Sequence, residues 1–138
     1  MQLSPQVIFE DNHLIAINKR PGEISQGDKT NDIPLVESIK DYLKQKYNKP
    51  GNVYAGLIHR IDRPVSGVLI FAKTSKAGER MSQIIRDRQF KKTYWAIVKN
   101  KPQQETAILK HHLLKNEKMN KSFAYAEKKG DSKEAILQ

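Results

Sequence analysis

The chain has 138 residues, of which 38% are hydrophobic, so it can build one modest core and is too short for several ordinary domains. Its 25 Lys and Arg residues exceed its 15 Asp and Glu residues, and the net charge of +10 favours a negatively charged partner such as nucleic acid. The lack of cysteine excludes disulfides, thiolate zinc sites and a cysteine nucleophile. Without a signal pattern or a membrane-length apolar run, the sequence predicts a soluble cytoplasmic protein.

The N-terminal half of the sequence predicts two strands followed by a helix. Short apolar runs at Val7–Phe9 and Leu14–Asn18 predict strands joined by a turn at Glu10–Asn12. Asp32 is expected to cap a helix that has Pro34 in its first turn. Its inward face is expected to carry four residues at helical spacing: Val36, Ile39, Leu43 and Tyr47.

The C-terminal half predicts a further helix among several strands. The continuous apolar run at residues 68–72 predicts a buried strand, and a helix is expected from Ser75 to about Arg88. Further strands are expected at Phe90–Val98 and Thr106–Leu109. Residues 115–133 are rich in Lys, Asn, Glu and Ser, which predicts a mobile hairpin.

The segment between His59 and Gly67 carries the strongest candidate for chemistry. It places Asp62 between Arg60 and Arg63, in the turn that precedes the apolar run, where a polar side chain at a sheet end can face a cleft. Asp62 is therefore a candidate nucleophile. The alternative is an ordinary turn aspartate flanked by two arginines, and the spacing alone favours that alternative.

Three ordered blocks of the sequence resemble the RluA-type family of RNA pseudouridine synthases. The His59-Arg60-Ile61-Asp62 run, followed by Val65-Ser66-Gly67 and a strand ending in Ala72-Lys73-Thr74, resembles the family signature. Residues 8–22 resemble the opening strands and their Lys-Pro-x-Gly turn, and residues 92–98 resemble the family's Lys-x-Tyr strand. The resemblance covers about residues 6 to 137, and Val65 replaces the family threonine.

This resemblance implies a fold, a reaction and a partner. The expected fold class is α+β, with a mixed, mainly antiparallel sheet flanked by helices, as in the catalytic domain of pseudouridine synthases. The implied reaction is isomerisation of uridine to pseudouridine in structured rRNA or tRNA, with no metal and no cofactor. The full-length protein is also expected to be a monomer.

The resemblance assigns three catalytic residues. Asp62 takes the role of the nucleophile, since a carboxylate can attack covalently or stabilise a sugar cation. Arg60 is expected to enter the stack that the target base vacates, because RNA bases must be extruded to react. Tyr94 is expected to stack on the flipped base near C5. An isolated strand aromatic such as Tyr94 is more often a core residue, and only the motif raises the functional reading.

Five further residues are expected to bind RNA. The cations among them are expected to contact phosphates, although any one of them is more often an ordinary solvated charge. The histidine is expected to orient the loop of Asp62 by hydrogen bonding rather than to transfer protons. These residues are His59, Arg63, Lys19, Arg20 and Lys92.

The C-terminus is expected to interrupt the family fold. Residues 132–138 resemble the start of a further family strand, and the family's basic partner of the catalytic carboxylate would lie beyond Gln138. Residues 1–138 are therefore expected to be the N-terminal portion of one catalytic domain, itself poorly active or inactive. A non-catalytic RNA-binding fragment or a degenerate synthase is the alternative. A hydrolase ranks third, because it needs a second carboxylate or a metal cluster near Asp62.

Overall fold

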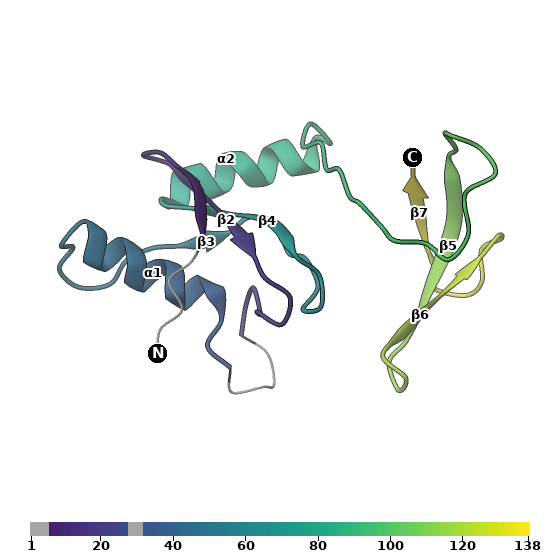
Figure 1. Cartoon of the computed structure of the whole chain (residues 1–138), viewed down its shortest axis with the longest axis horizontal. Coiled ribbons are helices and arrows are strands. Elements are labelled where there is room, and N and C mark those ends of the chain that lie inside the picture. Colours follow the sequence, from purple (N-terminus) through teal and green to yellow (C-terminus); the bar gives the residue numbers. More distant parts are fainter. Residues whose placement is uncertain (1–5, 28–31) are drawn as a thin grey trace. The chain divides into compact units, whose positions relative to one another are not determined.

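The structure is a computed structural model that describes residues 6–27 and 32–138. It divides into two compact units, Met1–Thr93 and Tyr94–Gln138, and each has its own antiparallel sheet (Figure 1). The helices belong to the first unit, and the combination of helices with antiparallel sheets confirms the predicted α+β class. That the whole chain forms one catalytic domain stays a prediction.

The first unit is built on a four-stranded sheet. Its strands are β1 (Val7–Glu10), β2 (Leu14–Lys19), β3 (Gly56–Leu57) and β4 (Gly67–Ala72). They lie in the order β1-β2-β4-β3, and every neighbouring pair is antiparallel. The predicted strands at residues 7–9, 14–18 and 68–72 are confirmed with small shifts at their ends, whereas the two-residue strand β3 was not predicted.

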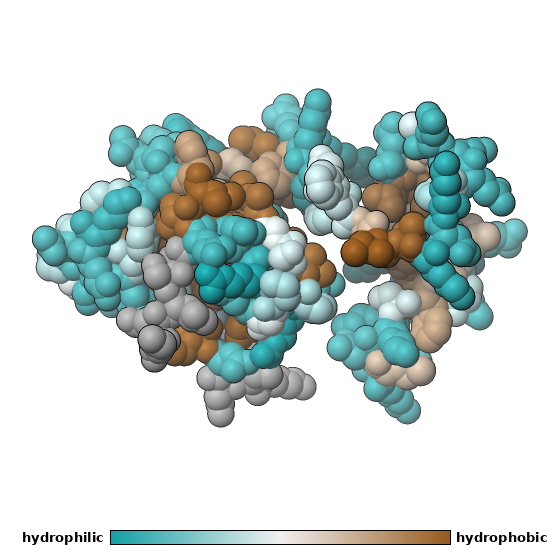
Figure 2. Space-filling view, viewed as in Figure 1, coloured by the Kyte–Doolittle hydropathy of each residue, from teal (hydrophilic) through white to brown (hydrophobic). Residues whose placement is uncertain are grey.

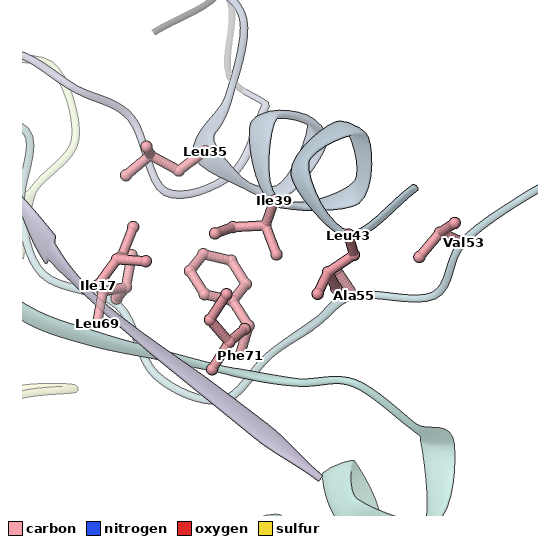
Figure 3. Packing of buried hydrophobic residues seen from close by; sticks show 9 residues of the cluster. Ile17, Leu35, Ile39, Leu43, Val53, Ala55, Leu69 and Phe71 are labelled. Atoms are coloured by element: carbon pink, nitrogen blue, oxygen red, sulfur yellow. The ribbon is translucent and has the colours of Figure 1, made fainter. Parts of the chain in front are cut away.

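Helix α1 (Leu35–Lys46) covers one face of this sheet. Ile17 on β2 lies opposite Leu69 on β4, so both side chains point to the same face, together with Phe71. Figure 3 shows these side chains meeting the buried residues of α1. The helix contributes its buried residues at helical spacing: Leu35, Ile39 and Leu43. This cluster is the hydrophobic core that supports the rest of the unit.

The start and end of α1 differ in detail from the prediction. The residue before the first helical turn is Pro34, with extended backbone angles and no side-chain cap, so the expected capping role of Asp32 is wrong. Asp32 stands two residues too early to reach the first free N–H groups. Tyr47, expected on the inward face, is the C-terminal cap and is 45% exposed, because its ring lies past the last helical turn.

Helix α2 (Ser75–Arg86) lies on the opposite face of the sheet. Its N-cap is Thr74, whose hydroxyl accepts a hydrogen bond of 3.2 Å from the backbone N–H of Ala77. Gly78 lies so close to the sheet that a Cβ placed there would be 3.7 Å from the Cβ of Ala72. Since Ala72 alternates with Phe71 along β4, α2 and α1 pack on opposite faces. The helix ends at Arg86, close to the predicted end.

The buried carboxylate of Glu10 links β1, α1 and the residue that follows β4. It lies at the end of the sheet opposite the start of β4. The side chain of Glu10 is only 7% exposed and accepts hydrogen bonds from Lys73 (2.7 Å), Lys46 (2.8 Å) and the hydroxyl of Tyr47 (2.6 Å). Burial raises the pKa of Glu10, but these hydrogen bonds outweigh it and hold the pKa at about 2. The network therefore stabilises the fold only while Glu10 is ionised.

The second unit is a three-stranded antiparallel sheet. Its strands are β5 (Leu109–Asn116), β6 (Lys121–Tyr125) and β7 (Lys133–Leu137), in the order β6-β5-β7. The predicted strand near the C-terminus is confirmed by β7. Residues 115–133 span the β5–β6 turn, β6 and the connection to β7, and their mobility stays a prediction.

The predicted strand at residues 90–98 is wrong. The backbone there is irregular, because a strand requires a neighbour for its hydrogen bonds and the described residues provide none. For the same reason Thr106–Ile108 stay outside β5, which begins at Leu109.

The second unit carries its apolar side chains near the surface. Among the described residues, every buried hydrophobic side chain belongs to the first unit, whereas Trp95 in the second is 97% exposed. Figure 2 shows hydrophobic surface on both units among hydrophilic side chains. No helix in the described part of the chain is both long enough and apolar enough to span a membrane.

Candidate functional site

The loop between β3 and β4 holds Asp62 and is tied to its surroundings by backbone hydrogen bonds. The N–H of Val65 donates to the carbonyl oxygen of Asp62 at 3.0 Å and closes a turn within the loop. The N–H of Gly22 donates to the carbonyl of Arg63 at 2.8 Å. Ile61 packs against the hydrophobic core. The loop is therefore a fixed part of the first unit.

Lys19 holds this loop from within. Its side chain is fully buried, and Nζ donates to four carbonyl oxygens, which belong to Arg20 (3.1 Å), Asp62 (3.1 Å), Arg63 (3.1 Å) and Val65 (2.7 Å). An ammonium has three N–H groups, so at least one hydrogen is shared. Burial lowers the pKa of Lys19, and the negative charges of Glu23 and Asp62 oppose this shift. The lysine expected to contact RNA is enclosed by protein instead.

Asp62 and Arg60 face the same hollow. It has a volume of about 520 Å³ and is lined by residues 24–27 and 60–63. Both side chains are exposed, and the Asp62 carboxylate has no hydrogen bond or ion pair to the described part of the chain. Among the described residues that line the hollow, Asp62 alone is acidic. The arrangement provides an accessible carboxylate beside an arginine, which suits nucleophilic or electrostatic chemistry on a cation.

His59 lies half-buried where the loop begins. Its ring packs on Phe90 with centroids 5.5 Å apart, and neither ring nitrogen has a hydrogen-bond partner among the described residues. The expected orienting hydrogen bond is therefore not found there. Burial lowers the pKa of His59, and the charge of Lys92 lowers it further. Lys92 itself is exposed. His59 thus contributes ring packing to the base of the loop.

Arg63 and Arg20 border a second hollow beside the first. The guanidinium of Arg63 donates to the carboxylate of Asp32 at 2.6 Å, and both side chains are about half exposed, at 45% and 53%. Arg20 is exposed, and its backbone N–H donates to the Glu23 carboxylate at 2.6 Å. This hollow has a volume of about 450 Å³. Sequence reasoning did not find the role of Asp32, because only the fold brings it to Arg63.

Tyr94 lies outside the unit that contains Asp62. It is the first residue of the second unit and is 59% exposed, so it is not the core residue that an isolated strand aromatic would usually be. The described residues contain no group of three or more His, Cys, Asp or Glu side chains placed to hold a metal ion.

The sequence matches the family described as RNA pseudouridylate synthase over residues 13–138, so the chain belongs to this family. It is 31% identical over 116 residues to the ribosomal large subunit pseudouridine synthase C of Pasteurella multocida, covering 84% of this chain and 34% of that protein. It is 34% identical over 97 residues to the tRNA pseudouridine synthase C of Pectobacterium carotovorum, covering 68% of this chain and 24% of that protein. The chain thus spans about a third or less of the length of these relatives.

The fold agrees with the family. The structure of human RNA pseudouridylate synthase domain containing 4 superposes with a TM-score of 0.74 at 19% identity, over 94% of this chain and 51% of that one. This likeness confirms the predicted pseudouridine synthase fold.

Proposed function

We propose that the protein to which this chain belongs isomerises uridine to pseudouridine in structured RNA, with the hollow at Asp62 as its catalytic site. Family membership supports the reaction class, and the curated relatives are named for rRNA and tRNA substrates. The observation that carries the proposal is the exposed carboxylate of Asp62 beside Arg60 in one hollow, on a loop anchored by Lys19. The reaction requires no metal and no cofactor.

The proposed isomerisation needs a carboxylate and no metal ion. Isomerisation breaks the bond from C1′ of the ribose to N1 of the base and forms a bond from C1′ to C5. The proton on C5 is lost and N1 gains one, so the atoms balance. The Asp62 carboxylate either attacks covalently or stabilises positive charge on the sugar, and both roles fit its exposure.

Base extrusion gives Arg60 its proposed role. A uridine within structured RNA must leave its stack before the C1′–N1 bond can be broken. Arg60 is exposed on the same hollow as Asp62, so its planar guanidinium can enter the vacated space while the base reaches the carboxylate. Tyr94 is proposed to stack on the extruded base.

The cationic residues have two different proposed roles: some contact RNA, and Lys19 positions the loop of Asp62. We assign phosphate contacts to the exposed side chains of Arg20 and Lys92, and an RNA contact to Arg63, whose guanidinium pairs with Asp32. Lys19 instead positions the loop, because a fully buried ammonium surrounded by carbonyl oxygens cannot also bind a phosphate. His59 supports the loop through its packing on Phe90.

A binding-only role is the second candidate. The net charge of +10 and the exposed arginines around the hollow would suffice for RNA affinity without chemistry. The hydrolase reading has less support, since Asp62 has no acidic neighbour among the described lining residues.

The test is release of tritium from RNA labelled at C5 of uridine, with the intact protein and separate rRNA and tRNA substrates. We expect release from one of the two RNA classes, with pseudouridine found in the product. RNA binding without tritium release from either class would refute the synthase and favour the binding module.

A further inference from the structure

We propose that the hollow bordered by Arg63 and Asp32 is a subsite for an unpaired guanine nucleotide next to the target uridine. This inference rests on the proposed function, because it assigns the hollow a neighbour of the same RNA strand. The hollow is lined by residues 20–24, Asp32, Ile33, Leu35, Ser38 and Arg63. Its volume of about 450 Å³ falls within the range of sites that hold small organic ligands.

The two hollows share a wall. Ile24 and Arg63 line both the hollow with Asp62 and the hollow with Asp32. A strand of RNA that places one base at Asp62 therefore brings a neighbouring nucleotide to the other side of Arg63. This adjacency makes the second hollow a subsite of the same RNA strand.

The wall between the hollows is fixed by hydrogen bonds. The N–H of Gly22 donates to the carbonyl of Arg63 at 2.8 Å, and the N–H of Leu35 donates to the carbonyl of Ile24 at 2.8 Å. The ammonium of Lys19 also donates to the Arg63 carbonyl, at 3.1 Å. The subsite is thus formed before RNA binds, which limits the entropy lost on binding.

The lining suits the flat, apolar faces of a nucleobase with a polar edge. Pro21 and Ile33 provide exposed apolar surface, and Ile33 is 69% exposed, which leaves its side chain available for contact; the buried Ile24 and Leu35 form the floor behind them. Arg20 adds a guanidinium without a hydrogen bond or ion pair to the described residues, suited to a phosphate. A base with its phosphate satisfies both kinds of surface.

The pair of Arg63 and Asp32 selects the base. Guanine alone presents two N–H donors, on N1 and N2, beside an acceptor, O6, on one edge. A carboxylate can accept from both donors while an adjacent guanidinium donates to O6. The Asp32 carboxylate and the Arg63 guanidinium lie side by side at 2.6 Å. An ion pair this exposed adds little to stability, so recognition accounts better for its position at the rim.

The experiment is an NMR titration of the 138-residue chain with four pentanucleotides, UGUGU, UAUAU, UCUCU and UUUUU. These RNAs vary both neighbours of the central uridine together. Amides of Gly22, Ile33 and Ser38 report on the subsite, and those of Gln26 and Gly27 report on the hollow at Asp62. We expect UGUGU to shift both groups and to bind about fivefold tighter than the other three RNAs, or more.

The variant Asp32→Asn should reduce this preference to less than twofold, because an amide cannot accept from both guanine donors. Asp131→Asn, an exposed residue in the second unit, makes the same change of charge and should leave the preference intact. Equal binding of all four RNAs, or an unchanged preference in Asp32→Asn, would overturn the subsite.

The two sets of reporter amides, one set in each hollow, separate this inference from the proposed function. Shifts at Gln26 and Gly27 alone would overturn the subsite and leave the role of Asp62 intact. Shifts at Gly22, Ile33 and Ser38 alone, with a guanine preference, would support the subsite and count against the proposed site at Asp62.

Discussion

Replacing Lys19 with methionine should loosen the catalytic loop more than the rest of the fold. Lys19→Met keeps the length of the side chain and removes the ammonium that donates to four carbonyl oxygens. Three of these oxygens keep a backbone donor, because Glu23, Val65 and Gly22 donate to Arg20, Asp62 and Arg63 respectively. The fourth, on Val65, accepts only from Lys19 among the described residues, at 2.7 Å.

The expected cost follows from that one orphaned acceptor. A buried carbonyl without a partner costs about 1–3 kcal/mol, and methionine recovers most of the lost packing. We therefore expect the free energy of unfolding to fall by about 2 kcal/mol, which lowers the melting temperature of a unit of this size by about 10 °C. Urea denaturation followed by circular dichroism measures the first quantity.

A matched variant separates the loop from the fold. Lys73→Met removes a largely buried ammonium, 8% exposed, at the opposite end of β4, where it pairs with Glu10. Both variants should lose stability, but only Lys19→Met should shift the backbone amide signals of residues 60–63, 65 and 66. Unchanged amide signals there, or a loss below about 0.5 kcal/mol, would refute the anchoring role of Lys19.

Three further predictions concern the acid response, the base-flipping arginine and the second unit. Because the pKa of Glu10 falls from 4.5 to about 2 on folding, its stabilisation of about 3 kcal/mol should be complete above pH 4.5 and be lost as the pH falls towards 2. Acid titration of Glu10→Gln should lack this loss, whereas the exposed control Glu37→Gln should keep it; equal curves would contradict the assignment. Arg60→Lys should lower turnover at least tenfold while changing RNA affinity less than threefold, and Arg80→Lys on α2 should change neither; parallel losses would make Arg60 a simple phosphate contact. Hydrogen exchange should be faster throughout β5, β6 and β7 than in β2 and β4, because the second unit has no buried hydrophobic side chain among its described residues; equal protection would contradict this.

The elements that bury an apolar face could be predicted from the sequence. Strands β2 and β4 follow from short apolar runs, and α1 and α2 follow from helical spacing, because burial of these faces is local information. The irregular backbone at residues 90–98 could not be foreseen in this way. Its side chains favour a strand, but a strand also needs a hydrogen-bonded neighbour, and neighbours are a property of the tertiary fold.

The candidate site likewise combines features that the sequence predicts with features that only the tertiary fold creates. The position of Asp62 before an apolar strand, and its sharing of one hollow with Arg60, agree with the pattern in the sequence. The burial of Lys19 could not be predicted, since lysine is almost always exposed unless polar groups surround its ammonium, and here three of the four carbonyl groups lie more than 40 residues away along the chain. The contact of Asp32 with Arg63 could not be predicted either, because it also joins residues far apart in the sequence.

Asp62→Asn in the intact protein tests the central claim most directly. The substitution keeps the size of the side chain and its backbone contacts while removing the charge of the proposed nucleophile. We expect release of tritium from C5-labelled RNA to fall at least a thousandfold, with RNA affinity within a few fold of the unmodified protein. Asp131→Asn should retain full activity. Substantial tritium release by Asp62→Asn would contradict the assignment of Asp62 as the catalytic carboxylate.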